Sequence, residues 1–419
     1  MSKRQSMTRR AALKALAGAS AIALAPSFAR TARAQAKPIR IGVIQPMSGP
    51  LAAYAQEGQP AFEYIINKVN SEGGIKSMGG AKLEILLADD TSQPARTAAE
   101  ARRLVTQENV SLLTGSMLSS QMMAISPVID ELKMPTLSIW AGASRSSQMY
   151  SLGFPYDRGY AESMASFVEW LVKQQGFKLN TVASCYSNYE AGQQVHNFLQ
   201  ERLKARGFKV VGDIPLDMKA QDQTAAMVRI RSFKPDLVMG LVTPRDGILL
   251  HQARYNLNYH DSLFVGGTGG YTDLTLWKDL GPQIGTAVLT RNLFGMTGFS
   301  PGARMESMQN ILTELKQKAN LKVQVGQAAI QAAQAARVIQ QVFELAGSTN
   351  PTAVLQAMAK VEIPFGDPNL YIARPKGLKF GEDRMLTDGS AMMIQWNPDQ
   401  TQSVVHPERF AQAKPRPKA

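Results

Sequence analysis

The sequence predicts an α/β protein made of two similar lobes, each a parallel sheet covered by helices on both faces. Short runs rich in Val, Ile and Leu alternate with longer segments of helical period from Ile39 to about Thr290. Alternation at this spacing is typical of strand–helix units with a parallel sheet. About four units precede Asp157 and about four follow it, so two lobes are the most economical arrangement.

Each unit has its own local signal. The first strand, "IRIGVI", leads to a helix on which Phe62, Ile65, Ile66 and Val69 share one face, and Pro60 inside this pattern predicts a kink or a late helix start. The strands that follow are expected in "KLEILLAD", "NVSLLTG", "MPTLSIW", "NTVASCYS", "FKVVGDIPL", "PDLVMGLV" and "LFVGG". The intervening helices are expected after Ser92-Gln93-Pro94 and over residues 119–132, 158–174, 190–206, 222–232 and 245–255.

The pattern changes after Thr290. Helices are predicted over residues 305–319, 325–346 and 351–360, and the tail from 377 to 407 is again strand-like, with turn residues at Asp388-Gly389 and Asn397-Pro398. The last residues, "AKPRPKA", are expected to form a disordered end.

The first 36 residues are predicted to be an export signal. They carry seven basic and no acidic residues, and an alanine- and leucine-rich run lies between "MTRR" and "ARAQA". Thr8-Arg9-Arg10-Ala11-Ala12-Leu13-Lys14 resembles the twin-arginine motif, although Thr8 and Ala12 replace its usual Ser and Phe, so general secretion stays open. Cleavage is expected near Ala34–Ala36, which would release the chain into the periplasm.

Composition excludes several classes of function. Without the first 36 residues the chain has 39 basic and 33 acidic residues, and these form no basic patch of the kind that nucleic-acid-binding proteins use. Cys185 is the only cysteine, which excludes an internal disulfide and any multi-cysteine metal site. We expect no cofactor and no metal.

Unusual residues gather where the predicted strands end. Small hydroxyl residues stand beside glycines, with aromatic residues nearby, in "PMSG", "GSMLSS", "WAGAS", "YSNY", "TPRD" and "GGTGGY". In open parallel sheets, ligands bind beyond the carboxyl ends of the strands. Such turns also favour Ser, Thr and Gly for helix capping alone, but six of them, three with an aromatic residue, favour a ligand held by backbone N–H groups and hydroxyls.

Enzymatic interpretations find little support. "GGTGG" lacks the third glycine of a dinucleotide fingerprint, and no Gly-x-Ser-x-Gly elbow occurs. The four histidines are not in metal-ligand spacing, and Asp89 and Asp90 are expected on opposite faces of a strand. Cys185 is expected to be a packed small residue rather than a nucleophile. The sequence therefore predicts that the protein is not an enzyme.

Residues 39–407 resemble the substrate-binding proteins of branched-chain amino acid ABC transporters, which have the type 1 periplasmic-binding fold. The resemblance rests on the order and spacing of "IRIGVIQPMSGPLAAYAQEG", "LTGSMLSSQMMAISPVID" with "MPTLSIWAGAS", "SNYEAGQQVHNFLQERLKARGFKVVGDIPL", and the ending "GLKFGEDR…AMMIQWNPDQTQSVVHP". It implies two doubly wound lobes joined by three crossovers near Asp157, Thr290 and Pro375, with the ligand in the cleft. Lobe one would hold residues 37–157 and 290–375, and lobe two would hold residues 158–289 and 376–419.

The resemblance also implies a function and a ligand site. Such a protein closes like a hinge on a small molecule and delivers it to a membrane permease driven by ATPase subunits, and we expect a monomer. Residues at positions matching the family's site, or beside them at the strand ends, are expected to contact the ligand: Tyr54, Ser119, Ser120, Trp140, Gly142, Ser144, Tyr189, Thr243, Thr268 and Tyr271. Leu118 is an alternative to Ser119, and Trp140 would form a wall of the pocket.

The ligand itself stays open. Members that bind amino acids usually offer a carboxylate to the ammonium group at a position that falls near Gly269 or Gly270 here. Asp246 or Asp273 would have to replace it, or the ligand is an aromatic or aliphatic carboxylate, or an amide, without an ammonium group. Arg145 and Arg245 are possible carboxylate partners but are expected to be solvated. A second class, a ligand-sensing receptor of the same fold without a transporter, would be distinguished by the absence of neighbouring permease and ATPase genes.

Overall fold

The structure is a computed structural model that describes residues 36–417 apart from residues 50, 116–118, 141–145, 154–158, 268, 323–324 and 388–390. The export signal expected over residues 1–36 therefore lies outside the described residues except for Ala36. Within the described part of the chain, no helix is long and apolar enough to cross a bilayer.

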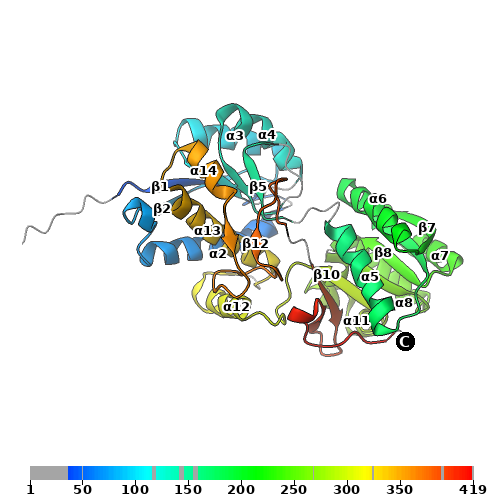
Figure 1. Cartoon of the computed structure of the whole chain (residues 1–419). Coiled ribbons are helices and arrows are strands. Elements are labelled where there is room, and N and C mark those ends of the chain that lie inside the picture. The colour runs from blue at the N-terminus through cyan, green and yellow to red at the C-terminus, as the bar shows by residue number, and fades with distance from the viewer. Residues whose placement is uncertain are drawn as a thin grey trace, which may run out of the picture. The chain divides into compact units, whose positions relative to one another are not determined.

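The first sheet has five strands in the order β2-β1-β3-β4-β5, all parallel (Figure 1). Its strands are β1 (Ile39–Gln45), β2 (Leu83–Asp89), β3 (Leu112–Gly115), β4 (Thr136–Ser138) and β5 (Met149–Ser151). The helices that follow in the chain are α2 (Ala52–Ser71), α3 (Pro94–Thr106) and α4 (Ser119–Leu132), with a short 3₁₀ turn over Lys76–Met78.

Helices cover both faces of this sheet. Leu104 of α3 and Ile125 of α4 pack with Ile44 and Leu113 of the sheet, in one hydrophobic cluster. Phe62, Ile65, Ile66 and Val69, predicted to share one face of α2, are all buried in a second cluster with Ile41 and Val43. Pro60 lies inside α2, so the helix does not start late.

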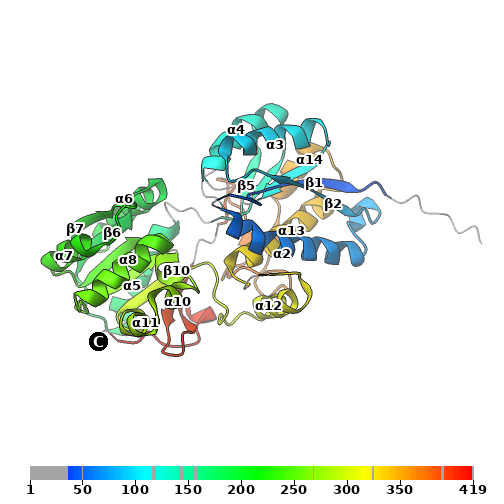
Figure 2. The same cartoon turned by 180° about the vertical axis from the view of Figure 1, so that it is seen from behind.

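The second sheet has seven strands in the order β14-β13-β10-β9-β8-β6-β7 (Figure 2). The strands are β6 (Thr181–Ser187), β7 (Lys209–Leu216), β8 (Leu237–Leu241), β9 (Leu263–Gly267), β10 (Leu293–Thr297), β13 (Met392–Trp396) and β14 (Gln402–His406). Its helices are α5 (Ala161–Gln175), α6 (Glu190–Ala205), α7 (Thr224–Phe233), α8 (Pro244–Asn256), α9 (Gly269–Thr272), α10 (Leu276–Leu280) and α11 (Pro282–Leu289). Strands β6 to β10 are parallel, whereas β13 and β14 are antiparallel additions at one edge.

The helices after Thr290 are α12 (Glu306–Lys318), α13 (Gln327–Ala346) and α14 (Pro351–Met358), followed by a two-stranded ladder of β11 (Glu362–Ile363) and β12 (Leu378–Lys379). Most residues of α13 are buried, and the helix packs on the same cluster as α2. The fold class predicted from the sequence, two doubly wound α/β lobes, is confirmed.

The lobe boundaries stay a prediction, with one refinement. The segment from residue 290, expected in lobe one, begins with β10, which pairs with β9 and β13 of the larger sheet. A crossover in this region would therefore follow Thr297. The expected crossover at Asp157 lies outside the described residues.

The expectation of a disordered end is wrong for residues 413–417. Gln395 of β13 donates a hydrogen bond to the carbonyl of Lys414 (3.2 Å) and accepts one from the backbone N–H of Arg416 (3.0 Å). The Arg416 guanidinium also donates to the backbone carbonyl of Trp396. The tail is thus anchored to the sheet by side-chain and backbone hydrogen bonds.

Candidate functional site

Both sheets share one strand order, which fixes where a ligand can bind. In the first sheet β1 lies between β2 and β3, and in the second β6 lies between β7 and β8, so each sheet has a switch point where successive connections leave in opposite directions. Ligands of doubly wound sheets bind beyond the carboxyl ends of the strands at this point. The segments after β1, β3, β6 and β8 are therefore the expected ligand-facing turns.

The turn after β1 is held by the end of β2. Ser48 donates its hydroxyl to Asp89 (2.7 Å), and Ser92 donates to the Ser48 carbonyl (2.8 Å). Burial opposes ionisation of Asp89, but hydrogen bonds from Ser48 and from the Thr91 and Ser48 backbone outweigh it, so its pKa is lowered. Gly49 has φ of 86°, and a Cβ there would lie 2.7 Å from the Thr91 carbonyl oxygen. Only glycine fits this turn without strain.

This turn presents Tyr54 from the start of α2. The Tyr54 ring lies 5.5 Å from the ring of Trp140, centroid to centroid, in an edge-to-face contact of 65°. Trp140 follows β4 at the carboxyl edge of the first sheet and is 8% exposed, whereas Tyr54 is 41% exposed. The structure therefore brings together the two aromatic residues predicted for lobe one.

The environment of Tyr54 keeps its hydroxyl protonated. Neighbouring atoms that exclude water raise the pKa of Tyr54, and the charges of Asp273 and Glu57 raise it further. The pKa of Glu57 is also raised by burial, although its Oε1 accepts hydrogen bonds from the backbone N–H groups of Gly326 (2.8 Å) and Ala329 (2.9 Å). The hydroxyl of Tyr54 thus stays protonated and is available as a donor.

In the second sheet, the predicted Thr243 takes part in a polar cluster at the switch point. Thr243 donates its hydroxyl to Oδ2 of Asp246 (3.1 Å), and its backbone N–H donates to Ser187 Oγ (3.0 Å). The Ser187 hydroxyl donates to the same Asp246 oxygen. Asp246 is 1% exposed, and its backbone N–H donates to the hydroxyl of Thr243, which is the N-cap residue of α8. Its Oδ2 therefore already accepts hydrogen bonds within the protein.

Tyr189 stands beside this cluster at the N-cap position of α6 and is half-buried. Burial raises the pKa of Tyr189 to about 12, with further contributions from Tyr54 and Asp246. Tyr54 and Tyr189 come from different lobes, yet they are close enough to influence each other's ionisation. Both phenols are donors at neutral pH.

Packing explains Gly269 and Gly270, the glycines near which the sequence resemblance implies a carboxylate in amino-acid binders. A Cβ on Gly270 would lie 2.7 Å from the Val242 carbonyl oxygen, and a Cβ on Gly247 of α8 would lie 2.3 Å from the Gly270 Cα. A Cβ on Gly269 would lie 2.5 Å from Pro244. The backbone of α9 therefore packs directly on the start of α8, and these glycines alone do not indicate a ligand without an ammonium group.

Tyr271 does not line the expected crevice. Its ring is 0% exposed, packs edge-to-face on His251 at 5.6 Å, and occupies the space where a Cβ on Gly266 would be. Its carbonyl accepts a hydrogen bond from the Trp396 indole (2.8 Å). These contacts place Tyr271 in the core of the second lobe, which differs from its expected position against the ligand.

Several predicted site residues cannot be placed. Gly142, Ser144 and Thr268 lie outside the described residues, as do Leu118 and Arg145.

Ser119, Ser120 and Arg245 lie within the described residues. Ser119 begins α4, and Ser120 follows it with an exposed side chain. Arg245 donates to the carbonyls of Met218 and Ala220 (2.8 Å each) and is half-exposed, which agrees with a surface role.

The structure contains one Ser–His–Asp arrangement that sequence reasoning missed. His196 Nδ1 lies 2.7 Å from Ser184 Oγ, and His196 Nε2 lies 3.5 Å from Asp213 Oδ2. Ser184 is 1% exposed, so a substrate has no access to its hydroxyl. Burial also raises the pKa of the Cys185 thiol, which is 0% exposed and poorly suited to act as a nucleophile. Neither group forms an accessible catalytic site.

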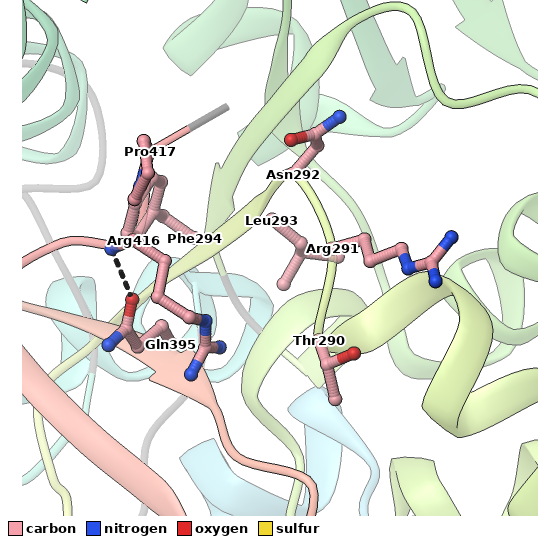
Figure 3. Close-up of a pocket in the computed structure, with 8 residues that line it drawn as sticks. All are labelled: Thr290, Arg291, Asn292, Leu293, Phe294, Gln395, Arg416 and Pro417. Carbon is pink, nitrogen blue, oxygen red and sulfur yellow. Dashed lines mark hydrogen bonds between the residues drawn. The ribbon is translucent and has the colours of Figure 1, made fainter. Parts of the chain in front are cut away.

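A pocket of about 300 Å³ lies at the amino end of β10, away from the carboxyl ends of the strands (Figure 3). Three of its polar side chains are already paired within the fold: Thr290 donates to the Thr286 carbonyl (2.7 Å), Asn292 donates to the His260 carbonyl (2.7 Å), and Gln395 binds the tail. Figure 3 shows the guanidinium groups of Arg291 and Arg416 on different sides of the pocket. These groups do not converge on a ligand.

Comparisons with known proteins agree with this geometry. The periplasmic binding protein family matches residues 38–401. The Leu/Ile/Val-binding protein homolog 7 of Brucella melitensis is 26% identical over 404 residues, covering 93% of this chain and 96% of the relative.

Two solved structures share the fold. The branched-chain amino acid transporter substrate binding protein LivJ from Streptococcus pneumoniae, in complex with isoleucine, is 20% identical with a TM-score of 0.69, covering 88% of this chain and 100% of that chain. A solute binding protein of an ABC transporter from Rhodopseudomonas palustris, in complex with 3,4-dihydroxy benzoic acid, is 19% identical with a TM-score of 0.69, covering 86% and 93%. With the family match extending over most of its length, the chain belongs to the periplasmic binding protein family, with the type 1 fold.

Proposed function

We propose that this protein is the extracytoplasmic substrate-binding protein of an ABC importer. It captures a small apolar amino acid, or an aromatic or aliphatic carboxylate, by hinge closure and delivers it to a membrane permease. The observation that carries the proposal is the edge-to-face pair of Tyr54 and Trp140 at the carboxyl edge of the first sheet, with Tyr189 of the second lobe close to Tyr54. Paired aromatic rings and phenolic donors suit a ligand with an apolar body and a polar end.

The relatives support both ligand types. LivJ from Streptococcus pneumoniae binds isoleucine, and the solute binding protein from Rhodopseudomonas palustris binds 3,4-dihydroxy benzoic acid. For an amino acid, the ammonium group needs an acidic partner, because a buried unpaired charge costs several kcal/mol.

Of the two acidic residues considered from the sequence, Asp273 is the better partner for an ammonium group. Asp246 is 1% exposed, and one of its oxygens already accepts hydrogen bonds from two hydroxyl groups, those of Ser187 and Thr243. One oxygen of Asp273 accepts a hydrogen bond from the backbone N–H of Thr275 (2.9 Å), so Asp273 differs from Asp246 in its exposure and its neighbours. Asp273 follows α9, is half-buried, and influences the ionisation of both Tyr54 and Glu57. An ammonium group between Asp273 and Glu57 would offset the repulsion between these carboxylates. This arrangement favours an amino acid over a ligand that carries only a carboxylate.

The proposal includes export and delivery. The basic, alanine-rich residues 1–36 would direct the chain across the membrane and be cleaved near Ala34–Ala36, leaving a periplasmic monomer. The lobes would be residues 37–157 with the helices after Thr297, and residues 158–297 with the tail.

A thermal-shift screen of the purified mature protein tests the proposal, because a ligand that binds only the folded state raises the melting temperature. The panel pairs isoleucine, leucine, valine and phenylalanine with the matching acids that lack the amine, and adds 4-hydroxybenzoate and 3,4-dihydroxybenzoate. Stabilisation by the amino acids would support Asp273 as the ammonium partner. Stabilisation by the acids alone would assign an organic-acid receptor, and no stabilisation by any member would refute the proposed ligand class.

A further inference from the structure

Trp140 carries a polar group that the fold leaves without a partner. The residue is 8% exposed, and its indole Nε1 is buried with no hydrogen-bond acceptor among the described residues. Trp140 follows β4 at the carboxyl edge of the first sheet, and its ring contacts Tyr54 at 5.5 Å. The unpaired donor therefore lies on the predicted ligand-facing edge of lobe one.

A buried N–H group without an acceptor is unfavourable. An indole nitrogen can only donate, so no change of tautomer or rotation of a hydrogen removes the deficit. A buried donor without an acceptor destabilises the folded protein, and the great majority of buried polar groups in folded proteins have a hydrogen-bond partner. The buried indole of Trp396, by contrast, has a partner, because its N–H donates to the Tyr271 carbonyl at 2.8 Å.

Trp277 provides an internal comparison. Its Nε1 also lacks a partner among the described residues, but the residue belongs to α10 in the core of the second lobe. Its ring packs on Trp396 at 5.9 Å, and its Nε1 lies 3.0 Å from where a Cβ on Gly285 would be. Trp277 is thus an unpaired donor within the packed core, whereas Trp140 is an unpaired donor at the strand ends beside a half-exposed tyrosine.

We propose that Trp140 donates its indole N–H to an acceptor oxygen of the bound ligand, a carboxylate or carbonyl oxygen, while the faces of Trp140 and Tyr54 cover the apolar part. The inference rests on the proposed function and deepens it. It makes Trp140 a specificity-determining residue: ligands with an acceptor oxygen next to an apolar body are favoured over analogues without that oxygen. Removal of the indole N–H should lower the binding affinity only for ligands that carry this oxygen.

The test is a cycle of protein and ligand variants, measured by isothermal titration calorimetry on the mature protein. Trp140→Phe keeps an aromatic ring and removes the donor, and Trp277→Phe is the matched control. Isoleucine is compared with 2-methylbutylamine, and 3,4-dihydroxybenzoate with catechol, because each second compound lacks only the carboxylate. Trp140→Phe should lower the affinity for the carboxylate-bearing probe tenfold or more, because hydrogen bonds to charged groups are among the stronger ones in proteins and a tenfold loss corresponds to about 1.4 kcal/mol. The affinity for the matching probe without the carboxylate should change less than twofold.

A spectroscopic readout keeps the inference falsifiable if Trp140→Phe fails to fold. The chain has four tryptophans, so the ¹H–¹⁵N spectrum of the wild-type protein should contain four indole signals. The carboxylate-bearing probe should shift the Trp140 indole proton downfield and leave that of Trp277 nearly unchanged.

The failure of the inference differs from the failure of the proposed function. Suppose that wild-type protein binds a carboxylate-bearing probe. The inference is refuted, and the proposed function stands, if the affinity of Trp140→Phe is within twofold of the wild-type affinity or if the Trp140 indole signal does not move. If wild-type protein binds none of these probes and no member of the thermal-shift panel, both are refuted.

Discussion

The close packing of α9 on α8 makes a strong prediction for Gly247→Ala. A Cβ at this position would lie 2.3 Å from the Gly270 Cα, about 1 Å closer than an ordinary van der Waals contact. Alanine favours a helix interior by roughly 0.5–1 kcal/mol relative to glycine, whereas overpacking costs about 1–3 kcal/mol. The net expectation is a loss of roughly 1–2 kcal/mol, because the colliding atom is backbone and cannot rotate away.

The substitution should also act on the ligand site. Asp273 directly follows α9, so a displaced α9 moves this carboxylate away from Tyr54 and Glu57. Urea unfolding at pH 7 measures the stability, and calorimetry with the best amino acid from the screen measures the affinity. We expect both to fall.

Gly58→Ala is the matched control. Gly58 also lies inside a helix, α2, but a Cβ there would lie 3.4 Å from the nearest atom, Ala332 Cβ, which is an ordinary contact. The same chemical change should therefore be neutral or stabilising by up to about 1 kcal/mol. If Gly247→Ala is as stable as Gly58→Ala and keeps its affinity, the packing argument for the glycines of α9 is refuted.

Three further predictions concern the site and its support. Tyr54→Ala should lower ligand affinity at least tenfold, since half of the aromatic pair is lost, and unchanged affinity in calorimetry would remove Tyr54 from the site. Asp273→Asn should lower the affinity for amino acids tenfold or more without lowering the affinity for the deaminated acids, because it removes the acidic partner of the ammonium group. Asp279→Asn, an exposed control on α10, should change neither affinity. Equal losses of affinity for both ligand types would argue against an ammonium contact. Burial and the charge of Arg254 lower the pKa of His251 to about 3, so below pH 6.5 the unfolded chain binds a proton that the folded chain does not. This histidine should therefore lower the free energy of unfolding by roughly 1.4 kcal/mol per pH unit as the pH drops from 6.5 toward 3. His251→Gln should reduce the dependence of this free energy on pH, measured by urea unfolding. An equal pH dependence in the two proteins would contradict the lowered pKa of His251.

The elements of the fold could be predicted because their signals are local. Residues 119–132 form α4 within the predicted bounds, and the predicted stripe of Phe62, Ile65, Ile66 and Val69 is the buried face of α2. Pro60 was ambiguous because its effect depends on packing, and the contact of α2 with α13 keeps the helix continuous around it.

The site could be predicted only in part, because sequence does not show direction or space. Tyr54 and Trp140, both predicted for the site, contact each other at the strand ends, although their role in binding stays a prediction. The ring of Tyr271 instead lies in the core, where it packs against His251 and the backbone of Gly266. The sequence does not show whether a glycine is required by the ligand or by a close backbone contact, which is why Gly269 and Gly270 left open whether the ligand carries an ammonium group.

Glu57 was missed for a related reason. From sequence alone, an acidic residue in a helical pattern is interpreted as a solvated side chain. Only the structure shows that Glu57 accepts hydrogen bonds from the backbone N–H groups at the start of α13. Its position three residues after Tyr54, on the same helical face, was the one available signal. The Ser–His–Asp cluster likewise depends on contacts between β6, α6 and β7 that no spacing in the sequence indicates.

The most direct test of the account is a crystal structure of the mature protein with the ligand that stabilises it most in the thermal-shift screen. We predict that the ligand lies beyond the carboxyl ends of both sheets, with its apolar part against Tyr54 and Trp140 and an oxygen within hydrogen-bond distance of the Trp140 indole. A ligand bound elsewhere, for example in the pocket beside Arg416 at the amino end of β10, would contradict the central claim.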